Sequence, residues 1–238
     1  MDQIKAHARQ AGVLYLALAI IAPFSLSYVP GVLSAAGGVS AATISEHQTL
    51  LQLSAASEMV YQILEIYIVL ALFALFRGVD RRLSLQMLVL GLVPIPVVFL
   101  NELTLFGSIM LANGELTPSG VSPPTQGVTA VLLYDLHQTG LLIASIFWGL
   151  WLFPLGRLIR TCNFMPSLLG WSVIIGGLGY VFRAMAFLGP QSLFSATATQ
   201  IAMSSAEIMI LGEVPVIAGL LWLGLRNISS QQIALLKD

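Results

Sequence analysis

Six stretches of this chain are mostly apolar and about 20 residues long or longer, the length that crosses the hydrocarbon core of a bilayer as a helix. They cover residues 12–30, 56–76, 84–112, 128–153, 166–188 and 199–225. Only 9% of the 238 residues are charged, whereas a soluble domain has about 25% charged residues. The sequence therefore predicts an all-α polytopic transmembrane helix bundle, with six spans in a single transmembrane domain over residues 1–238.

Nine of the ten Lys and Arg residues lie at the two ends of the chain and in alternate connections between these spans. These residues are Lys5, Arg9, Arg77, Arg81, Arg82, Arg157, Arg160, Arg226 and Lys237. The connections 31–55, 113–127 and 189–198 contain no Lys or Arg. Because cationic loops stay in the cytoplasm, both termini are expected to be cytoplasmic. We expect a multi-pass protein of the cell membrane, which in a bacterium is the cytoplasmic membrane, with the lipid bilayer as its partner.

Two local patterns modify the simple arrangement of straight spans. Thr43 and, three residues later, Glu46 form a capping-box pattern, which predicts a short surface helix between spans 1 and 2. Pro94 and Pro96 lie inside the third span, and Pro215 lies inside the sixth. Because proline removes a backbone donor and clashes with the preceding turn, kinks are expected at these positions.

The predicted spans contain ionisable side chains, which are costly in lipid and are therefore candidate functional residues. They are Glu58, Glu65, Glu102, Asp135, His137, Arg183, Glu207 and Glu213. At about 1.5 Å per residue, most of them lie in the outer half of the bilayer, which predicts a polar cavity there. Glu213 falls nearer the middle. Glu58 falls nearer the outer end of its span, where it is equally compatible with a place at the membrane interface.

Helical spacing selects the candidate ligand-binding residues from this set and from their polar neighbours. These candidates are Glu65, Tyr61, Glu102, Asp135, His137, Gln138, Arg183, Glu207 and Glu213. Asp135 and His137 are two residues apart, about 200° around a helix, so they cannot hold one metal ion together. A purely carboxylate metal site stays open, but the Glu-x-x-His pairs of bundle di-iron proteins are absent, so no metal ligand and no cofactor are assigned.

Several classes of function are excluded by simple features. The net charge of −1 argues against a nucleic-acid partner. The single cysteine, Cys162, cannot form a disulfide within the chain. Retinal-type chemistry needs a lysine inside the membrane, and both lysines, Lys5 and Lys237, are near the ends of the chain. The chain has no CxxC, HExxH or GxSxG motif and no phosphate-binding glycine loop.

From the fourth span onward the sequence resembles a known family. The runs that carry the resemblance are Asp135-Leu136-His137, Gly140, Phe147-Trp148-Gly149-Leu150, Gly156, Phe164-Met165-Pro166, Leu169-Gly170, Gly176, Gly179-Tyr180, Gly212-Glu213 and Leu221-Trp222-Leu223. They are similar to a bacterial integral-membrane family catalogued as domain of unknown function number 4386. The resemblance implies a six-helix membrane bundle, gives no activity, and draws attention to Asp135, His137 and Glu213. Arg183 stands where the family often has an acidic residue.

Three functions remain open. The first is binding of a small ligand or proton-coupled transport, in a cavity lined by Glu65, Asp135, His137 and Glu213. The second is a membrane-embedded enzyme that acts on a lipophilic, isoprenoid-like substrate, with a protonated carboxyl group of Asp135, Glu65 or Glu213 as general acid. The third is a non-catalytic membrane subunit whose buried polar groups hold helices together.

The predicted orientation can be tested with cysteines placed in two connections of a Cys162→Ser variant. We expect Ser119→Cys, in the connection without cations, to react with a membrane-impermeant maleimide in intact cells. Gly78→Cys, in the connection that carries Arg77 and Arg81, should react only after the cells are permeabilised. Labelling of Gly78→Cys but not of Ser119→Cys in intact cells would reverse the predicted orientation.

Overall fold

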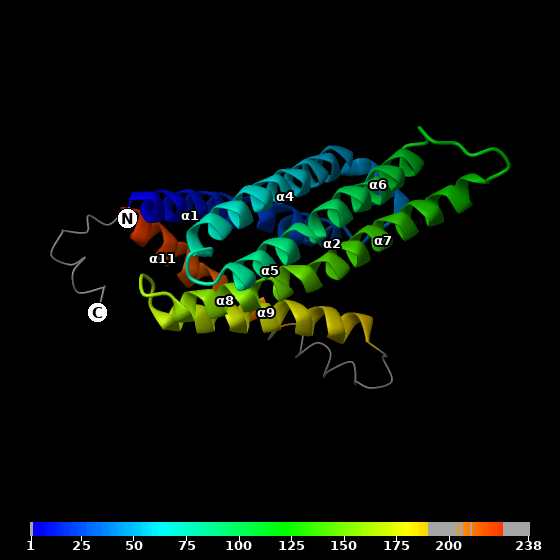
Figure 1. The fold of residues 1–238 in the computed structure, drawn as a ribbon. Coiled ribbons are helices and arrows are strands. Elements are labelled where there is room, and N and C mark those ends of the chain that lie inside the picture. Colours follow the sequence, from blue (N-terminus) through cyan, green and yellow to red (C-terminus); the bar gives the residue numbers. More distant parts are fainter. Residues whose placement is uncertain (1, 190–203, 205–206, 210, 226–238) are drawn as a thin grey trace. The chain divides into compact units, whose positions relative to one another are not determined.

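The computed structural model describes residues 2–189, 204, 207–209 and 211–225, and within these residues there is no β-strand (Figure 1). The elements are α1 (Asp2–Pro23), η1 (Phe24–Tyr28), α2 (Val29–Ala35), α3 (Ala41–Glu46), α4 (Gln48–Phe76), α5 (Arg81–Leu92), α6 (Pro94–Ala112), α7 (Pro123–Leu150), α8 (Leu152–Thr161), α9 (Ser167–Leu188), η3 (Leu211–Glu213) and α11 (Val214–Leu225).

Six helical segments are long and apolar enough to cross a membrane, which confirms the predicted all-α, six-span class. They are Asp2–Ala35, Gln48–Phe76, Arg81–Ala112, Pro123–Thr161, Ser167–Leu188 and Glu207–Leu225. The first part of the sixth predicted span, together with Arg226 and Lys237, lies outside the described residues. The cytoplasmic position of the termini and the single transmembrane domain stay predictions.

The short helix before the second span forms, but its predicted cap was wrong. Ser40 is the N-cap of α3, and its Oγ accepts a hydrogen bond from the backbone N–H of Thr43 at 3.1 Å. Two glycines with φ near +95°, Gly37 and Gly38, lead into Ser40, whose backbone is extended. Thr43 is therefore the third residue inside the helix. The second span begins at Gln48, well before the predicted residue 56.

The prolines inside the predicted spans mark places where a helix starts again. Val93 separates α5 from α6, and Pro94 is the first residue of α6. Pro215 is the second residue of α11, which follows the 3₁₀ turn η3. Proline is tolerated in the first turn of a helix, where its missing N–H would have no intrahelical acceptor. The expected kinks are thus interruptions between two helical elements.

The chain divides into two compact units, which are described separately. Unit 1 comprises Met1–Leu16, Glu65–Pro94 and Ser145–Asp238, and unit 2 comprises Ala17–Leu64 and Ile95–Ala144. The boundaries fall inside α1, α4 and α7 and near the junction of α5 and α6. The helices α1, α4, α6 and α7 therefore contribute residues to both units.

In unit 1, glycines allow α8 and α9 to pack with their backbones close together. A Cβ atom on Gly156 would lie 2.6 Å from the carbonyl oxygen of Gly170, and one on Gly170 would clash with the carbonyl oxygen of Gly156. The guanidinium carbon of Arg160 lies 3.8 Å from the ring centroid of Trp171, a cation–π contact between the same two helices. Small residues at such interfaces are typical of membrane helices, which gain contact area when their backbones approach.

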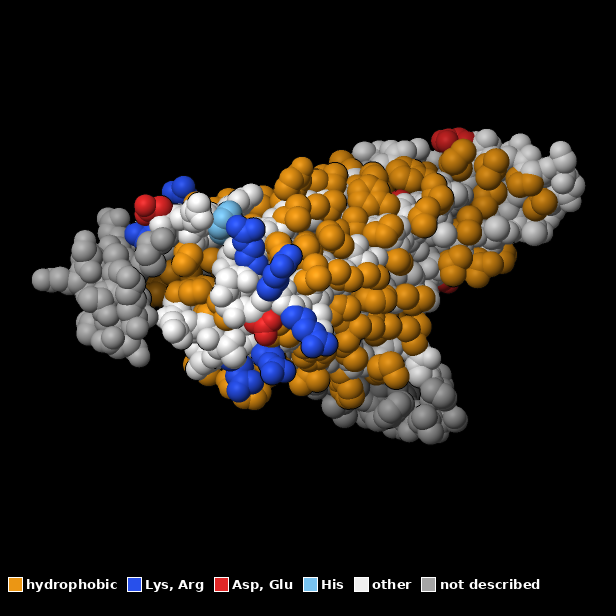
Figure 2. Space-filling model, viewed as in Figure 1, with side chains coloured by type: hydrophobic (Ala, Val, Ile, Leu, Met, Phe, Trp, Pro, Cys, Tyr) orange, Lys and Arg blue, Asp and Glu red, His pale blue; other side chains and the backbone are white. Residues whose placement is uncertain are grey.

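The described Lys and Arg residues all belong to unit 1. The side chains of Arg77, Arg81, Arg82, Arg157 and Arg160 are exposed. Figure 2 shows Lys and Arg side chains gathered on one part of the visible face, beside a surface of hydrophobic side chains. Such a separation of cationic and apolar surface is typical of a protein that meets both water and lipid.

In unit 2, apolar side chains from α2, α3, α4, α6 and α7 form one buried cluster. Its members include Leu33, Ile44, Leu51, Leu105, Ile109 and Tyr134. Because this cluster joins the short helix α3 to the long helices, it fixes the beginning of α4 against α6 and α7.

The glycine contact between α8 and α9 gives a test of the fold. We expect Gly156→Ala to destabilise the protein by about 1–3 kcal/mol, because the new methyl group meets a backbone carbonyl that cannot rotate away. Unfolding in mixed micelles with increasing SDS, followed by tryptophan fluorescence, measures the change. Gly31→Ala in α2 is the control, since nothing lies within 4 Å of its Cβ position and alanine there should be neutral or slightly stabilising. Equal stability of Gly156→Ala and the wild type would contradict the close packing.

Candidate functional site

Three ionisable side chains from three helices meet inside unit 2. Glu58 comes from α4, Glu102 from α6 and His137 from α7. Their exposed fractions are 1%, 2% and 1%. One ligand atom from each lies within 4.8 Å of the others, so the group could hold a metal ion. We call these three residues the carboxylate–histidine cluster.

The cluster forms because polar residues occupy core positions on their helices. On α4, Ser54, Glu58 and Gln62 follow one another at intervals of four residues, and all three are buried. On α6, Glu102 shares its face with Leu105 and Ile109 of the apolar core, the spacing expected for one side of a helix. The same face that packs each helix therefore brings its polar group into the interior.

Glu58 is held between a hydroxyl group and the histidine. Its Oε1 accepts a hydrogen bond from the Oγ of Ser54 at 3.3 Å. Its Oε2 lies 3.5 Å from the Nε2 of His137. The second carboxylate oxygen is thus turned toward the imidazole.

Asn101 contacts the other ring nitrogen of His137 in two ways. Its side-chain Nδ2 donates to the backbone carbonyl of His137 at 2.8 Å and lies 3.1 Å from Nδ1. Its backbone carbonyl oxygen lies 3.4 Å from the same Nδ1. Asn101 therefore offers a donor to one neutral tautomer of His137 and an acceptor to the other. In the second tautomer the Nε2 lone pair is free to bind a ligand.

Gly140 provides the space for this arrangement. A Cβ atom at position 140 would clash with the side-chain amide of Asn101. Gly140 is one turn after His137 on α7. The Asn101 side chain therefore packs against the α7 backbone next to the histidine.

Several polar atoms of the cluster and its surroundings have no hydrogen-bond partner among the described residues. They are Glu58 Oε2, both carboxylate oxygens of Glu102, His137 Nε2, and both amide atoms of Gln62. Gln62 is fully buried and lies one turn after Glu58. Since buried polar atoms are normally hydrogen-bonded, this concentration points to a bound proton, water or ligand at the cluster.

Unit 2 contains no Lys or Arg residue. The carboxylates of Glu58 and Glu102 therefore have no Lys or Arg in their own unit, and His137 is the titratable base within the cluster itself. Two neighbouring carboxylates out of water repel each other and lose their hydration. A proton or a bound cation would relieve both costs.

The residues predicted to line one cavity are divided between the two units. Tyr61, Glu102, Asp135, His137 and Gln138 belong to unit 2, and Glu65, Arg183, Glu207 and Glu213 belong to unit 1. Within unit 2, Tyr61 is buried and Gln138 is half-buried. Asp135 is exposed although it is only two residues from buried His137, because the two side chains leave α7 on opposite faces.

In unit 1 the candidate residues have other partners. The hydroxyl of Tyr15 donates a hydrogen bond to a carboxylate oxygen of Glu213. Glu65 is buried, and it lies within electrostatic range of Tyr180, as does Arg183. Glu207 is exposed. The described part of unit 1 thus gives Glu213 and Glu65 separate surroundings.

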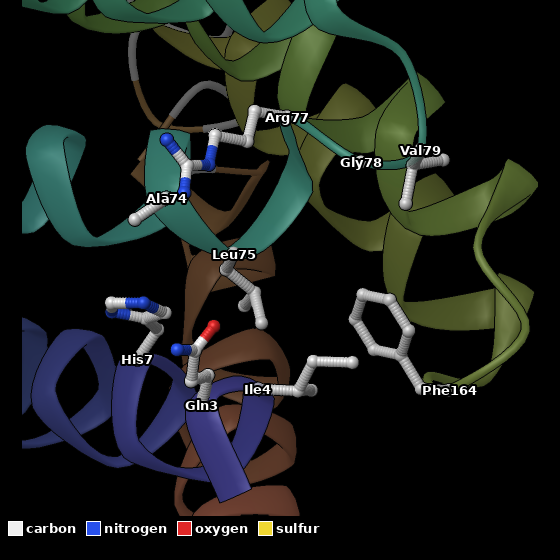
Figure 3. Close-up of a pocket in the computed structure, with 9 residues that line it drawn as sticks. All are labelled: Gln3, Ile4, His7, Ala74, Leu75, Arg77, Gly78, Val79 and Phe164. Atoms are coloured by element: carbon white, nitrogen blue, oxygen red, sulfur yellow. The ribbon is translucent and has the colours of Figure 1, made fainter. Parts of the chain in front are cut away.

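Unit 1 also has an open pocket of about 340 Å³ beside its cationic surface. Figure 3 shows Ile4 and His7 of α1 on one side, with Leu75 at the end of α4 and Phe164 on the others. Arg77 also lines this pocket. None of the residues selected from the sequence as candidates lies in it.

The sequence analysis did not include Glu58, Gln62 and Asn101 among its ligand-binding candidates. Glu58, Gln62 and Glu65 follow one another at intervals of three or four residues, and this helical spacing of polar residues was the available signal. Glu58 was placed near the membrane interface because the span was expected to begin at residue 56. With α4 beginning at Gln48, Glu58 is about 15 Å along the helix. Asn101 is uncharged and gave no signal of its own.

A family model described as a domain of unknown function, DUF4386, matches residues 10–225. The match confirms the resemblance seen in the sequence. No curated protein and no solved structure matches the chain.

The contact between Gly140 and Asn101 can be tested with a double-mutant cycle. Gly140→Ala alone should lower stability by about 1–3 kcal/mol, because its methyl group displaces the Asn101 amide. In an Asn101→Ala background the methyl group finds room, so the same change should cost at least about 0.5 kcal/mol less. SDS unfolding of the four proteins gives the coupling free energy. Additive effects would show that the two residues do not interact.

Proposed function

The chain belongs to the DUF4386 family, and we propose that it binds a small cation at the carboxylate–histidine cluster and carries it across the membrane in exchange for protons. The coarser part of this description, a multi-pass membrane protein, follows from six helices long and apolar enough to span a bilayer.

One observation carries the proposal: two buried carboxylates lie beside a histidine in a unit without Lys or Arg. An uncompensated buried charge costs several kcal/mol, so the site favours occupants that bring positive charge. Protons and small cations are the two classes of occupant that meet this need. Competition between them at the same oxygen atoms is the elementary step of proton-coupled exchange.

The location of the cluster supports transport rather than a surface binding site. Glu58 and Glu102 each lie ten residues from an end of their helix, at Gln48 and Ala112 respectively, which is about 15 Å along the axis. Ionisable groups at such depth typically mark ion or substrate pathways.

The interruptions in the helices also suit a transporter. η1 is a π-helical turn between α1 and α2, and Val93 separates α5 from α6. Transport proteins commonly use discontinuous helices near their binding sites, and π-helical turns are frequent at functional sites. Such points allow a helix to bend without breaking the packing of its remaining turns.

The test is uptake of tracer Na⁺, tetramethylammonium and Zn²⁺ into proteoliposomes that contain a trapped pH-sensitive dye. We expect the wild type to take up at least one of these cations, with a rise in internal pH as protons leave. Glu58→Gln and Glu102→Gln should each reduce that uptake about tenfold or more, the loss expected when a supporting group of a cation site is removed.

Glu115→Gln is the matched control, because Glu115 is a carboxylate of the same unit with an exposed side chain. Its uptake should equal that of the wild type. If Glu58→Gln and Glu102→Gln both transported at the wild-type rate, the cluster would not be the transport site.

A further inference from the structure

The donor atoms of the carboxylate–histidine cluster identify the class of cation more closely. We infer that Glu58, Glu102 and His137 form a three-ligand site for a divalent transition-metal ion, for which Zn²⁺ is the probe. This inference rests on the proposed function, since it names the cation that the same site would bind.

The three side chains are already close to the geometry that such an ion needs. Their ligand atoms lie within 4.8 Å of one another, and Glu58 Oε2 and His137 Nε2 are 3.5 Å apart. Ligands about 2.0–2.1 Å from a tetrahedral zinc ion are about 3.3 Å from one another. The Glu58–His137 pair therefore needs almost no adjustment, and a rotation of the Glu102 carboxylate can complete the set.

The atoms without hydrogen-bond partners are the atoms that would bind the ion. Within the described residues, Glu58 Oε2, His137 Nε2 and both oxygens of Glu102 make no hydrogen bond, and Glu58 Oε2 and His137 Nε2 face each other at 3.5 Å. Glu102 is 2% exposed, so bulk water does not satisfy its carboxylate. A metal ion would use one lone pair of each residue at once, which separates this cluster from an ordinary group of surface acids.

The surrounding contacts resemble the supporting groups of a metal site. Ser54 holds the oxygen of Glu58 that does not face the histidine. The Nδ1 of His137 lies 3.4 Å from the backbone carbonyl oxygen of Asn101, while the Asn101 amide, 3.1 Å from Nδ1, also donates to the His137 carbonyl at 2.8 Å. A histidine that binds a metal through Nε2 usually donates its Nδ1–H to a carbonyl or carboxylate oxygen. Asn101 provides that acceptor.

Charge favours a divalent ion over a monovalent one. Two carboxylates and a neutral imidazole carry a charge of −2, and unit 2 has no Lys or Arg to balance it. A divalent ion makes the buried site neutral, whereas Na⁺ would leave one negative charge in a medium that penalises it.

The mixture of nitrogen and oxygen donors favours a transition metal over Mg²⁺ or Ca²⁺. Those two ions prefer six or more oxygen ligands, whereas imidazole suits zinc and its neighbours. Three protein ligands leave a fourth position open in a tetrahedral site. An ion that enters and leaves the site requires such an open coordination position. The amide of Gln62 lies one turn from Glu58 on the same face of α4.

The test is isothermal titration of detergent-solubilised, full-length protein with ZnCl₂, using a purification tag without histidine. We expect one Zn²⁺ per wild-type chain, with affinity at least about tenfold weaker in Glu102→Gln and in His137→Gln. Glu115→Gln and His47→Gln are matched controls, because both residues are in unit 2 but outside the cluster, and the Zn²⁺ affinity of these variants should equal that of the wild type. Absorption of bound Co²⁺ in the visible range gives a second readout of tetrahedral coordination.

Thermal unfolding shows whether a variant has folded. Glu102→Gln replaces a buried carboxylate beside a second carboxylate by a neutral amide of similar size, so without metal it should be at least as stable as the wild type. Added Zn²⁺ should raise the Tm of the wild type, because a ligand of the native state stabilises it, and it should raise the Tm of Glu102→Gln less. The inference is overturned if the wild type shows no saturable Zn²⁺ binding near one equivalent. It is also overturned if Glu102→Gln and His137→Gln both bind Zn²⁺ with the affinity of the wild type.

The outcome also separates this inference from the proposed function. Glu102-dependent uptake of Na⁺ or tetramethylammonium without Zn²⁺ binding would overturn the metal site and leave cation transport standing. Tight, Glu102-dependent Zn²⁺ binding without uptake of any cation would support the metal site and overturn transport.

Discussion

A bilayer offers no hydrogen bonds to a backbone that crosses it, and this constraint determines the rest of the structure. Every backbone group of a span has to find its hydrogen-bond partner within the helix. The side chains alone therefore determine how one helix differs from the next in its contacts. The interruptions at Val93 and before Val214 occur at prolines, where one backbone donor is missing in any case. The chain therefore places its irregular backbone where it costs least.

The two compact units differ in the chemistry of their interiors. Unit 1 contains the described Lys and Arg residues and packs α8 against α9 through Gly156 and Gly170. Unit 2 has no Lys or Arg and buries two carboxylates beside a histidine. A merely structural polar contact between membrane helices contributes about 0.6–2 kcal/mol, and partners that satisfy each other would suffice for that role. Glu102 and Gln62 instead have buried polar atoms without a hydrogen bond among the described residues, which supports the binding role proposed for the cluster.

The fold could be predicted from the sequence because length and hydropathy decide whether a helix can cross a bilayer. The start of α3 was harder to predict, because Ser40 and Thr43 are both residue types that cap helices well. The glycines before Ser40 determine which of the two is the N-cap. The site was predicted in part. Glu102 and His137 were selected because buried charge is rare, but helical periodicity does not tell which face of α7 turns inward, so exposed Asp135 received equal weight. Asn101 acts through a contact with another helix, which the spacing of residues along one chain segment does not reveal.

The packing of the Asn101 amide against the backbone at Gly140 has a consequence for how sequences of this family diverge. A larger side chain at position 140 excludes the asparagine, and His137 then loses the side-chain amide that donates to its backbone carbonyl and lies 3.1 Å from its Nδ1. Positions 101 and 140 are consequently constrained as a pair. A chain with Asn at position 101 has to keep Gly at position 140, whereas a chain with a smaller residue at position 101 can have other residues at position 140. Covariation of these two positions across relatives would therefore record, in evolutionary terms, whether the histidine needs this support.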